Sequence, residues 1–157
     1  MRQILSRREV RIDHWRYPDE AGGGPQVATL AGLLAATEAG TLAAAEWGVR
    51  LGPADDVALL APHVGRLALI VVHFQASSDG RGYTQGQLLR QRHGYRGELR
   101  AAGAIGRDHL FLLARCGFDA FDFDSREDPQ AALAHLERYS VAYQGAAGTL
   151  VRPRERP

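Results

Sequence analysis

Arginine side chains recur around the most apolar part of the chain, where they could bind an anion. Arg81 follows the β-branched run 67–74, Arg100 lies within the next apolar segment, and Arg107 comes shortly after it. Guanidinium groups bind oxyanions through paired hydrogen bonds, and free amides at helix starts add further donors. Together with the Tyr83 hydroxyl, these three arginines predict a site for sulfite, sulfate or phosphate.

Two carboxylates near these arginines could act on such a ligand. Asp79 shares a loop with Arg81, and Asp124 stands at the end of an aromatic-rich segment. A carboxylate beside a bound anionic metabolite could serve as a general base, so a small enzyme is one hypothesis. The alternative is structural: Asp79 shapes a tight loop, and the arginines pair with the nearby acids Glu98 and Asp108. The sequence leaves both interpretations open.

Metal and cofactor chemistry is not expected. His73 and His109 stand apart, and the sequence contains neither an H-x-x-x-H nor a C-x-x-C spacing. Cys116 is the single cysteine, so one chain can form no internal disulfide and hold no thiolate-bound iron–sulfur cluster. No G-x-G-x-x-G follows a strand, which disfavours an independent nicotinamide-dependent oxidoreductase. We therefore assign no metal ligands and no cofactor.

The elements that must position these residues alternate between strand and helix. Strands are predicted at 67–74, which is β-branched and almost continuously apolar, at 97–102, and at 118–124, where aromatic residues alternate with aspartates. A helix is predicted from Thr84, which begins a capping-box spacing, to His93, before a glycine. A strand as apolar as 67–74 is typical of a parallel sheet covered on both faces.

The N-terminal part is predicted to form a hairpin. Apolar residues at 3–5 and 10–12 flank a charged turn within residues 2–17. Trp15 and Tyr17 should then fold back onto the domain and pack there.

Further elements complete the predicted βα pattern. A helix is expected at 27–38, the first strand of the parallel set at 47–51, and a short helix after Asp55, where a carboxylate favours the helix dipole. The last helix should begin at Pro129, preceded by a capping aspartate, and end near 143–144.

The predicted fold class is therefore α/β, with an N-terminal β-hairpin followed by about four βα units in a mainly parallel sheet. A closed barrel of eight units needs about 250 residues. With 157 residues, the chain should form an open sheet or half of a TIM-like barrel, and two such halves could close a ring as a homodimer. In either case, the loops after each strand gather on one edge, where ligands bind.

Length and composition limit the number of domains and the kinds of partner that we expect. A chain of this length supports one domain, expected at residues 1–145, with a disordered tail at 146–157. The net charge of +1 gives no field that favours nucleic acid or a membrane, and all the basic residues are arginine. The N-terminal MRQILSRREV lacks the apolar stretch of a signal peptide, so we expect a cytoplasmic protein.

Several blocks of sequence resemble a known family. DGRGYT, LLRQRHGYRGELRAAG and RDHLFLLARCGFDAF, together with Tyr143-Gln144, are similar to the bacterial domain of unknown function 934 family, over residues 4–144. Members are described as oxidoreductases of sulfite reduction, encoded beside sulfite reductase. The resemblance therefore implies an accessory protein of assimilatory sulfite reduction that binds a small oxyanion or docks to the reductase. A non-catalytic structural subunit is a further alternative.

Two positions depart from the pattern of this family. Ser78 stands where relatives usually carry an aromatic residue, and Ala104 stands where they carry an acid. If that acid acts in relatives, this chain lacks the corresponding step.

Overall fold

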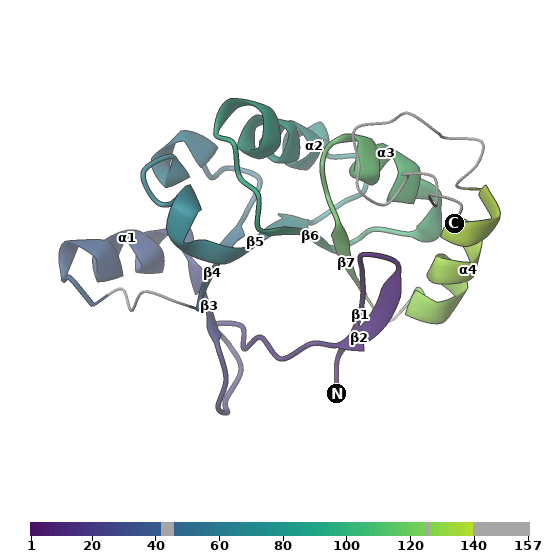
Figure 1. Ribbon diagram of the computed structural model, residues 1–157, viewed down its shortest axis with the longest axis horizontal. Coiled ribbons are helices and arrows are strands. Elements are labelled where there is room, and N and C mark those ends of the chain that lie inside the picture. Colours follow the sequence, from purple (N-terminus) through teal and green to yellow (C-terminus); the bar gives the residue numbers. More distant parts are fainter. Residues whose placement is uncertain (42–45, 125, 140–157) are drawn as a thin grey trace, which may run out of the picture.

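The computed structural model describes residues 1–41, 46–124 and 126–139 (Figure 1). In this part of the chain, seven strands form one sheet, in the order β2-β1-β7-β6-β5-β4-β3. The strands are β1 (Gln3–Ser6), β2 (Glu9–Ile12), β3 (Gln26–Thr29), β4 (Trp47–Leu51), β5 (Leu67–Phe74), β6 (Glu98–Gly103) and β7 (Ala120–Phe123). Strands β3 to β7 are parallel, whereas β1 pairs antiparallel with β7 and with β2.

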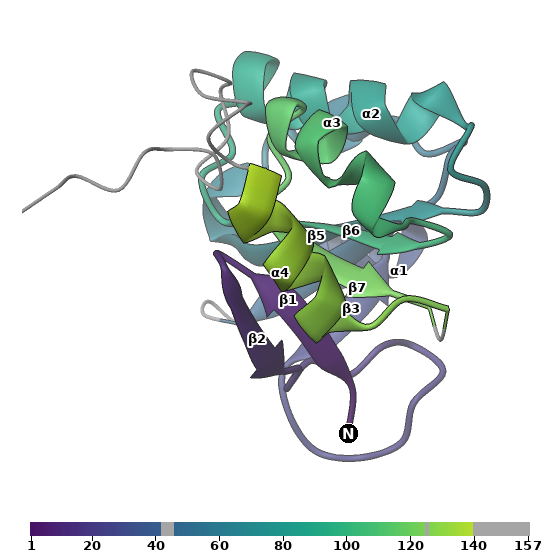
Figure 2. The same cartoon turned by 90° about the vertical axis from the view of Figure 1, so that its right-hand side faces the viewer.

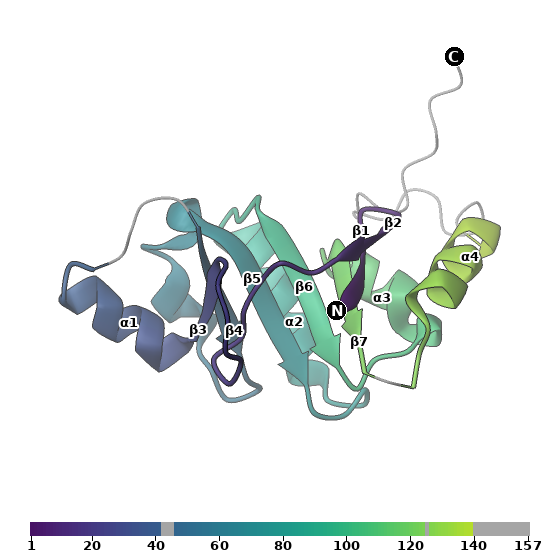
Figure 3. The same ribbon diagram turned by 90° about the horizontal axis from the view of Figure 1, so that it is seen from below.

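Helices and helical turns connect the parallel strands, and a last helix follows β7. They are α1 (Leu30–Glu38), the 3₁₀ turns η1 (Val57–Leu60) and η2 (Val64–Arg66), α2 (Gly80–Gln87) with the π-helical turn η3 (Leu88–Arg92), η4 (Arg107–His109), α3 (Leu110–Arg115) and α4 (Pro129–Tyr139). Helices α2 and α3 lie behind the sheet in Figure 3, and α4 packs beside β1 (Figure 2). None of the helices in the described residues is both long and apolar enough to cross a membrane.

The position of these helices follows from the strand order. Consecutive parallel strands are neighbours, so crossovers of one hand place their helices on a single face of the sheet. The side chains that point to this face are apolar and belong to the main core: Val49, Leu51, Ile70, Val72, Leu99, Ala101, Phe121 and Phe123.

The opposite face of the sheet is covered by an irregular segment rather than by helices. Residues 13–25, which we call the N-terminal cover, run across this face between β2 and β3 (Figure 3). Trp15 and Tyr17 from the cover pack on a small apolar cluster that includes Val71 and Ala102, as the sequence predicted. Charged side chains lie beside this cluster, so we call this side the polar face.

The structure confirms the predicted fold class and selects the open sheet. The N-terminal hairpin is present, and the strands predicted at 47–51 and 67–74 have those bounds. The third predicted strand is shorter and spans Ala120–Phe123. The expected end of the last helix near 143–144 and the expected tail at 146–157 lie outside the described residues.

The helix predicted at 27–38 is wrong in its first turn. Residues Gln26–Thr29 form β3, which pairs in parallel with β4, and helix α1 begins only at Leu30. The Thr29 hydroxyl accepts a hydrogen bond of 3.1 Å from Gly32 N and caps the helix. Pairing with β4 outweighs the helix propensity of this Ala- and Leu-rich segment, so the parallel set begins at β3 and has one more strand than predicted.

The predicted capping box at Thr84 is also wrong. Helix α2 begins four residues earlier, where the Asp79 carboxylate accepts a hydrogen bond of 3.1 Å from Arg81 N. Thr84 lies inside the helix and donates its hydroxyl to Gly80 O at 3.3 Å. The following π-helical turn ends near His93, and Gly94 adopts a φ of +65°, as expected of a C-terminal glycine.

Candidate functional site

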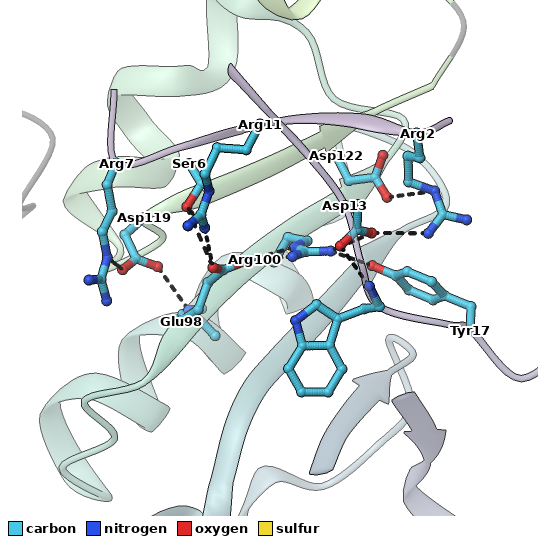
Figure 4. A network of polar contacts seen from close by, with 12 residues as sticks. Arg2, Ser6, Arg7, Arg11, Asp13, Tyr17, Glu98, Arg100, Asp119 and Asp122 are labelled. Carbon is cyan, nitrogen blue, oxygen red and sulfur yellow. Dashed lines mark hydrogen bonds and ion pairs between the residues drawn. The ribbon is translucent and has the colours of Figure 1, made fainter. Parts of the chain in front are cut away.

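A buried arginine organises the polar face of the sheet (Figure 4). Arg100, on β6, is 1 % exposed. Its Nε and Nη2 atoms donate to Glu98 Oε1 at 3.0 and 2.7 Å. Its Nη1 atom donates to Asp13 Oδ2 at 2.9 Å and to the Tyr17 hydroxyl oxygen at 3.1 Å. Arg100 thereby joins the centre of the sheet to the N-terminal cover.

The environment of Arg100 keeps this guanidinium charged. Burial alone would lower its pKa, but Tyr17, Glu98 and Asp13 raise the pKa above its usual value. Burial raises the pKa of Tyr17 to about 12, so its hydroxyl stays protonated at neutral pH. The four hydrogen bonds of this guanidinium all go to acceptors within the protein. We infer that Arg100 serves to position the cover.

The network continues toward the carboxyl ends of the strands. Arg2 donates to Asp13 Oδ2 at 3.1 Å, pairs with Glu20, and lies 3.6 Å from Asp122 Oδ2. Its guanidinium also stacks 4.4 Å above the centre of the Tyr17 ring. Arg2 therefore holds three acids at one place, two from the N-terminal cover and one from β7.

A pocket of about 280 Å³ opens where this network ends. The cover and the first residues supply one wall, made of Arg2, Tyr17, Asp19 and Glu20. The strand ends supply the rest, chiefly Arg50, His73, Ala102, Gly103, Asp122 and Asp124. We call this the strand-end pocket, because it lies at the carboxyl ends of β4 to β7, where α/β proteins bind ligands.

Strand register explains the shape of the pocket. His73 on β5 pairs with Ala102 on β6, which pairs with Asp122 on β7, so the three residues form one row across the polar face. Neighbouring strands lie about 4.8 Å apart, which places His73 and Asp122 about 10 Å apart at the backbone. Ala102 between them has only a methyl group, so the middle of the row is low and forms the floor.

Two groups in the pocket have shifted proton affinities. Burial, together with the charge of Arg50, lowers the pKa of His73, which keeps its imidazole neutral at pH 7. Burial raises the pKa of Asp122 to about 6, although the guanidinium groups of Arg2 and Arg100 oppose the shift. Shifted groups that face a common pocket are typical of functional sites.

Arg50 differs from the other pocket cation. Arg2 is held by three carboxylates, whereas Arg50 has no hydrogen bond or ion pair with any residue in the described ranges. Its β-strand position points the side chain to the polar face, opposite Val71 in the register. Arg50 is thus a half-buried arginine that lines the pocket and has no acceptor among the described residues.

The structure places two of the predicted arginines in ion pairs of their own. Arg81 pairs with Asp79 at 2.7 Å, at the start of α2, and its side chain is 62 % exposed. Arg107 pairs with Glu127 at 3.2 Å and is 50 % exposed. The Tyr83 hydroxyl donates to Ser77 O at 3.2 Å. These residues do not line the strand-end pocket, and a role for them in anion binding stays a prediction.

The remaining predicted site residues lie in different surroundings. Asp124 lies in the strand-end pocket, two residues after Asp122. It also accepts a hydrogen bond from Arg126 N at 3.0 Å, so one of its oxygens shapes the loop. Arg100 pairs with Glu98, which is the structural alternative that the sequence had left open. Asp79 acts as a helix cap.

Sequence reasoning missed Arg50 as a site residue and gave His73 and Asp122 no role. A signal was nevertheless present, because the strands of a parallel sheet should be nearly continuously apolar. Polar residues interrupt β4, β5, β6 and β7 at alternate positions, and the register brings all of them to one face. Such interruptions indicate a polar face, and those nearest the strand ends indicate a site.

The donor set of the pocket suits an organic ligand more than a metal ion. Within residues 1–41, 46–124 and 126–139, no three His, Cys, Asp or Glu side chains are grouped as metal ligands would be. The pocket instead combines an arginine, a neutral histidine and several carboxylates around a small floor. These groups can bind charged atoms of a ligand and exchange protons with it.

Comparison with known proteins adds a family but no activity. No curated protein matches the chain. Residues 48–152 match the family described as bacterial protein of unknown function (DUF934), a range that includes β4 from its second residue, β5 to β7 and the strand-end half of the pocket. The match covers most of the chain, and the protein belongs to the DUF934 family.

Proposed function

We propose that this protein binds a small oxyanion group in the strand-end pocket and acts as an accessory protein of assimilatory sulfite reduction. The observation that carries the first part is the half-buried Arg50, which faces the pocket without an acceptor among the described residues. A guanidinium offers a planar fork of N–H donors that matches an oxyanion. A bound anion would supply the missing acceptor.

Other features of the pocket support anion binding next to Arg50. His73 is close enough for the charge of Arg50 to lower its pKa, and a neutral imidazole still offers one N–H donor. The pocket volume of about 280 Å³ suits a small metabolite, since pockets for drug-sized ligands span roughly 300–1,000 Å³. The site also lies at the edge of the sheet where parallel α/β folds bind ligands.

The role in sulfite reduction rests on the family resemblance. Genes of such proteins lie beside the sulfite reductase gene, which makes sulfite or sulfate a natural candidate for the oxyanion. The same resemblance makes sulfite reductase a candidate partner, to which the protein could dock in the cytoplasm.

Thermal unfolding tests the anion site. We expect millimolar sulfite, sulfate or phosphate to raise the unfolding midpoint, because a ligand that binds the native state stabilises it. Arg50→Gln should abolish the increase, whereas the control Arg107→Gln should retain it. If no anion raises the midpoint, the proposal is wrong. If only Arg107→Gln abolished the increase, the anion would instead bind at the loop after β6 that contains Arg107.

An enzyme is the second candidate, and the opposite pKa shifts of His73 and Asp122 favour it. A neutral His73 could accept a proton while Asp122, with a pKa of about 6, donates one from the other side of the ligand. These residues would then perform the acid–base step for which Asp79 and Asp124 were predicted. Proton NMR in D₂O distinguishes the two functions, because only an enzyme would exchange a carbon-bound proton of the ligand.

A further inference from the structure

The strand-end pocket has two poles of opposite charge. Arg50 and His73 stand on β4 and β5, whereas Asp122 and Asp124 stand on β7 and directly after it. Between them, β6 contributes Ala102 and Gly103, which carry no polar side chain. At the backbone, His73 and Asp122 are therefore about 10 Å apart across a low floor, which is two strand spacings, and Arg50 lies one strand further from Asp122.

The acids of the pocket outnumber its guanidinium groups. Asp19, Glu20, Asp122 and Asp124 line it, against Arg2 and Arg50. Arg2 compensates Glu20 and Asp122, with which it pairs. Asp124 has a partner in Arg126, but that side chain is 84 % exposed, and an exposed pair contributes little. The acidic pole thus retains negative charge that the pocket itself does not balance.

A bare oxyanion would satisfy only half of this arrangement. Sulfate or phosphate at Arg50 would form an ion pair with the guanidinium. The same anion would also lie in a small pocket with uncompensated carboxylates, and like charges at such distances repel. A ligand that carries an ammonium group at its other end would meet both poles. Charge complementarity of this kind gives specificity, because a ligand lacking either group leaves a pole unpaired.

We propose that the strand-end pocket binds a small zwitterion, with its carboxylate, sulfonate or similar oxyanion group at Arg50 and His73 and its ammonium group at Asp122 and Asp124. This inference rests on the proposed anion site and extends it from an anionic group to a class of molecule. The small volume of the pocket favours molecules of amino-acid size. The acceptors at the acidic pole are carboxylates, which form their strongest hydrogen bonds with charged donors.

Matched pairs of small molecules test this inference by calorimetry with the full chain. Each zwitterion is compared with the counterpart in which a hydroxyl replaces the ammonium group: taurine with isethionate, L-alanine with L-lactate, and β-alanine with 3-hydroxypropionate. We expect at least one zwitterion to bind ten-fold or more tightly than its counterpart. If every hydroxyl compound binds as well as its zwitterion, the inference is wrong.

Two variants assign the poles. Asp124→Asn should weaken the preferred zwitterion and leave its hydroxyl counterpart unchanged or more tightly bound, because the substitution removes both an acceptor for the ammonium group and a charge that repels the anion. Arg50→Gln should abolish the binding of both. If Asp124→Asn weakens both compounds equally, the ammonium group does not lie at this pole, and the inference is contradicted.

The same experiments separate this inference from the anion site on which it rests. If sulfite stabilises the protein through Arg50 but no zwitterion is preferred, the anion site stands and the zwitterion is excluded. If neither sulfite nor any zwitterion binds, both proposals fail together. Binding of a zwitterion that Arg50→Gln leaves unaffected would overturn the assignment of the anionic pole.

Discussion

Arg100 shows how one buried charge determines the structure of a whole face. Its guanidinium balances Asp13 and Glu98, whose side chains are 1 % and 14 % exposed, so its removal would leave two carboxylates without their main partner. We expect Arg100→Met to destabilise the protein by about 3–5 kcal/mol, as is usual when one member of a buried ion pair is removed. Urea unfolding measures this free energy.

A matched control exists for this prediction. Arg107 also forms an ion pair, but its side chain is 50 % exposed, and we expect Arg107→Met to change stability by less than about 1 kcal/mol. Equal effects of the two substitutions would show that the Arg100 pair is not the main attachment of the N-terminal cover.

Asp122 should reduce the stability of the fold at neutral pH. Burial raises its pKa from 3.8 to about 6, so between these values the native state retains a proton that the unfolded chain releases. Stability attributable to this residue therefore falls as the pH rises from about 4 to 6, by up to about 3 kcal/mol. Arg2 and Arg100 limit the loss by their positive charge, whereas Asp13 adds to it.

Asp122→Asn removes this titration. We expect the variant to match the natural protein at pH 4 and to exceed its free energy of unfolding at pH 8 by up to about 3 kcal/mol. Denaturant unfolding at the two pH values tests this difference. A variant that is less stable than the natural protein at pH 8 would show that the Arg2 contact outweighs the cost of burial.

At the scale of residues, sequence reasoning identified part of the site. Asp124 was predicted and lies in the pocket, because the end of an apolar strand can be located from composition alone. Arg50 and His73 were not predicted as partners, because their proximity depends on the pairing of β4 with β5. Arg100 was placed on its strand correctly, but its acceptor Asp13 is 87 positions away, and no local pattern reveals such a pair.

Helix α2 lies against the sheet through two glycines. A Cβ at Gly86 would lie 2.5 Å from Phe118 Cε2, and one at Gly82 would lie 2.5 Å from Phe74 Cε1. We expect Gly86→Ala to destabilise the protein by about 1–3 kcal/mol through overpacking, although alanine has the better helix propensity. Gly80, at the exposed start of the same helix, has nothing within 4 Å of a Cβ.

Gly80→Ala is therefore the control for this prediction. It should leave stability unchanged or raise it by about 0.5–1 kcal/mol, because the unfolded chain loses freedom and no contact is disturbed. Thermal unfolding of the two variants gives the comparison. If Gly86→Ala is as stable as Gly80→Ala, the close approach of α2 to the Phe118 ring is not required.

At the scale of elements, strands at the centre of the sheet were predicted best. Strand β5 is covered on both faces, so its sequence is apolar except for His73 and its bounds are clear. Strand β3 has only four residues and runs directly into the Ala- and Leu-rich α1, so the helical pattern of α1 masks it. Only the partner strand β4 decides the difference, and pairing between strands cannot be read from a single segment.

The whole molecule is built as a one-sided α/β sheet with a second layer from its own N-terminus. The strand order places the helices on one face, and the cover of residues 13–25 shields the other (Figure 3). The pocket consequently combines Arg2 to Glu20 with strand ends that follow them by 30 residues or more. Attachment of the cover, through Asp13, is therefore a condition for an intact pocket.

Asp13→Asn should loosen the cover without unfolding the sheet. Asp13 accepts hydrogen bonds from Arg100 at 2.9 Å and from Arg2 at 3.1 Å, and a neutral amide would weaken both contacts. We expect amide hydrogen exchange to accelerate in residues 14–20 while β5 keeps its protection, because local opening needs less free energy than global unfolding. Sulfite binding should weaken in the same variant, since Tyr17, Asp19 and Glu20 line the pocket. Equal acceleration of exchange in β5 would mean instead that cover and sheet unfold as one unit, and the network on the polar face would then stabilise the entire fold.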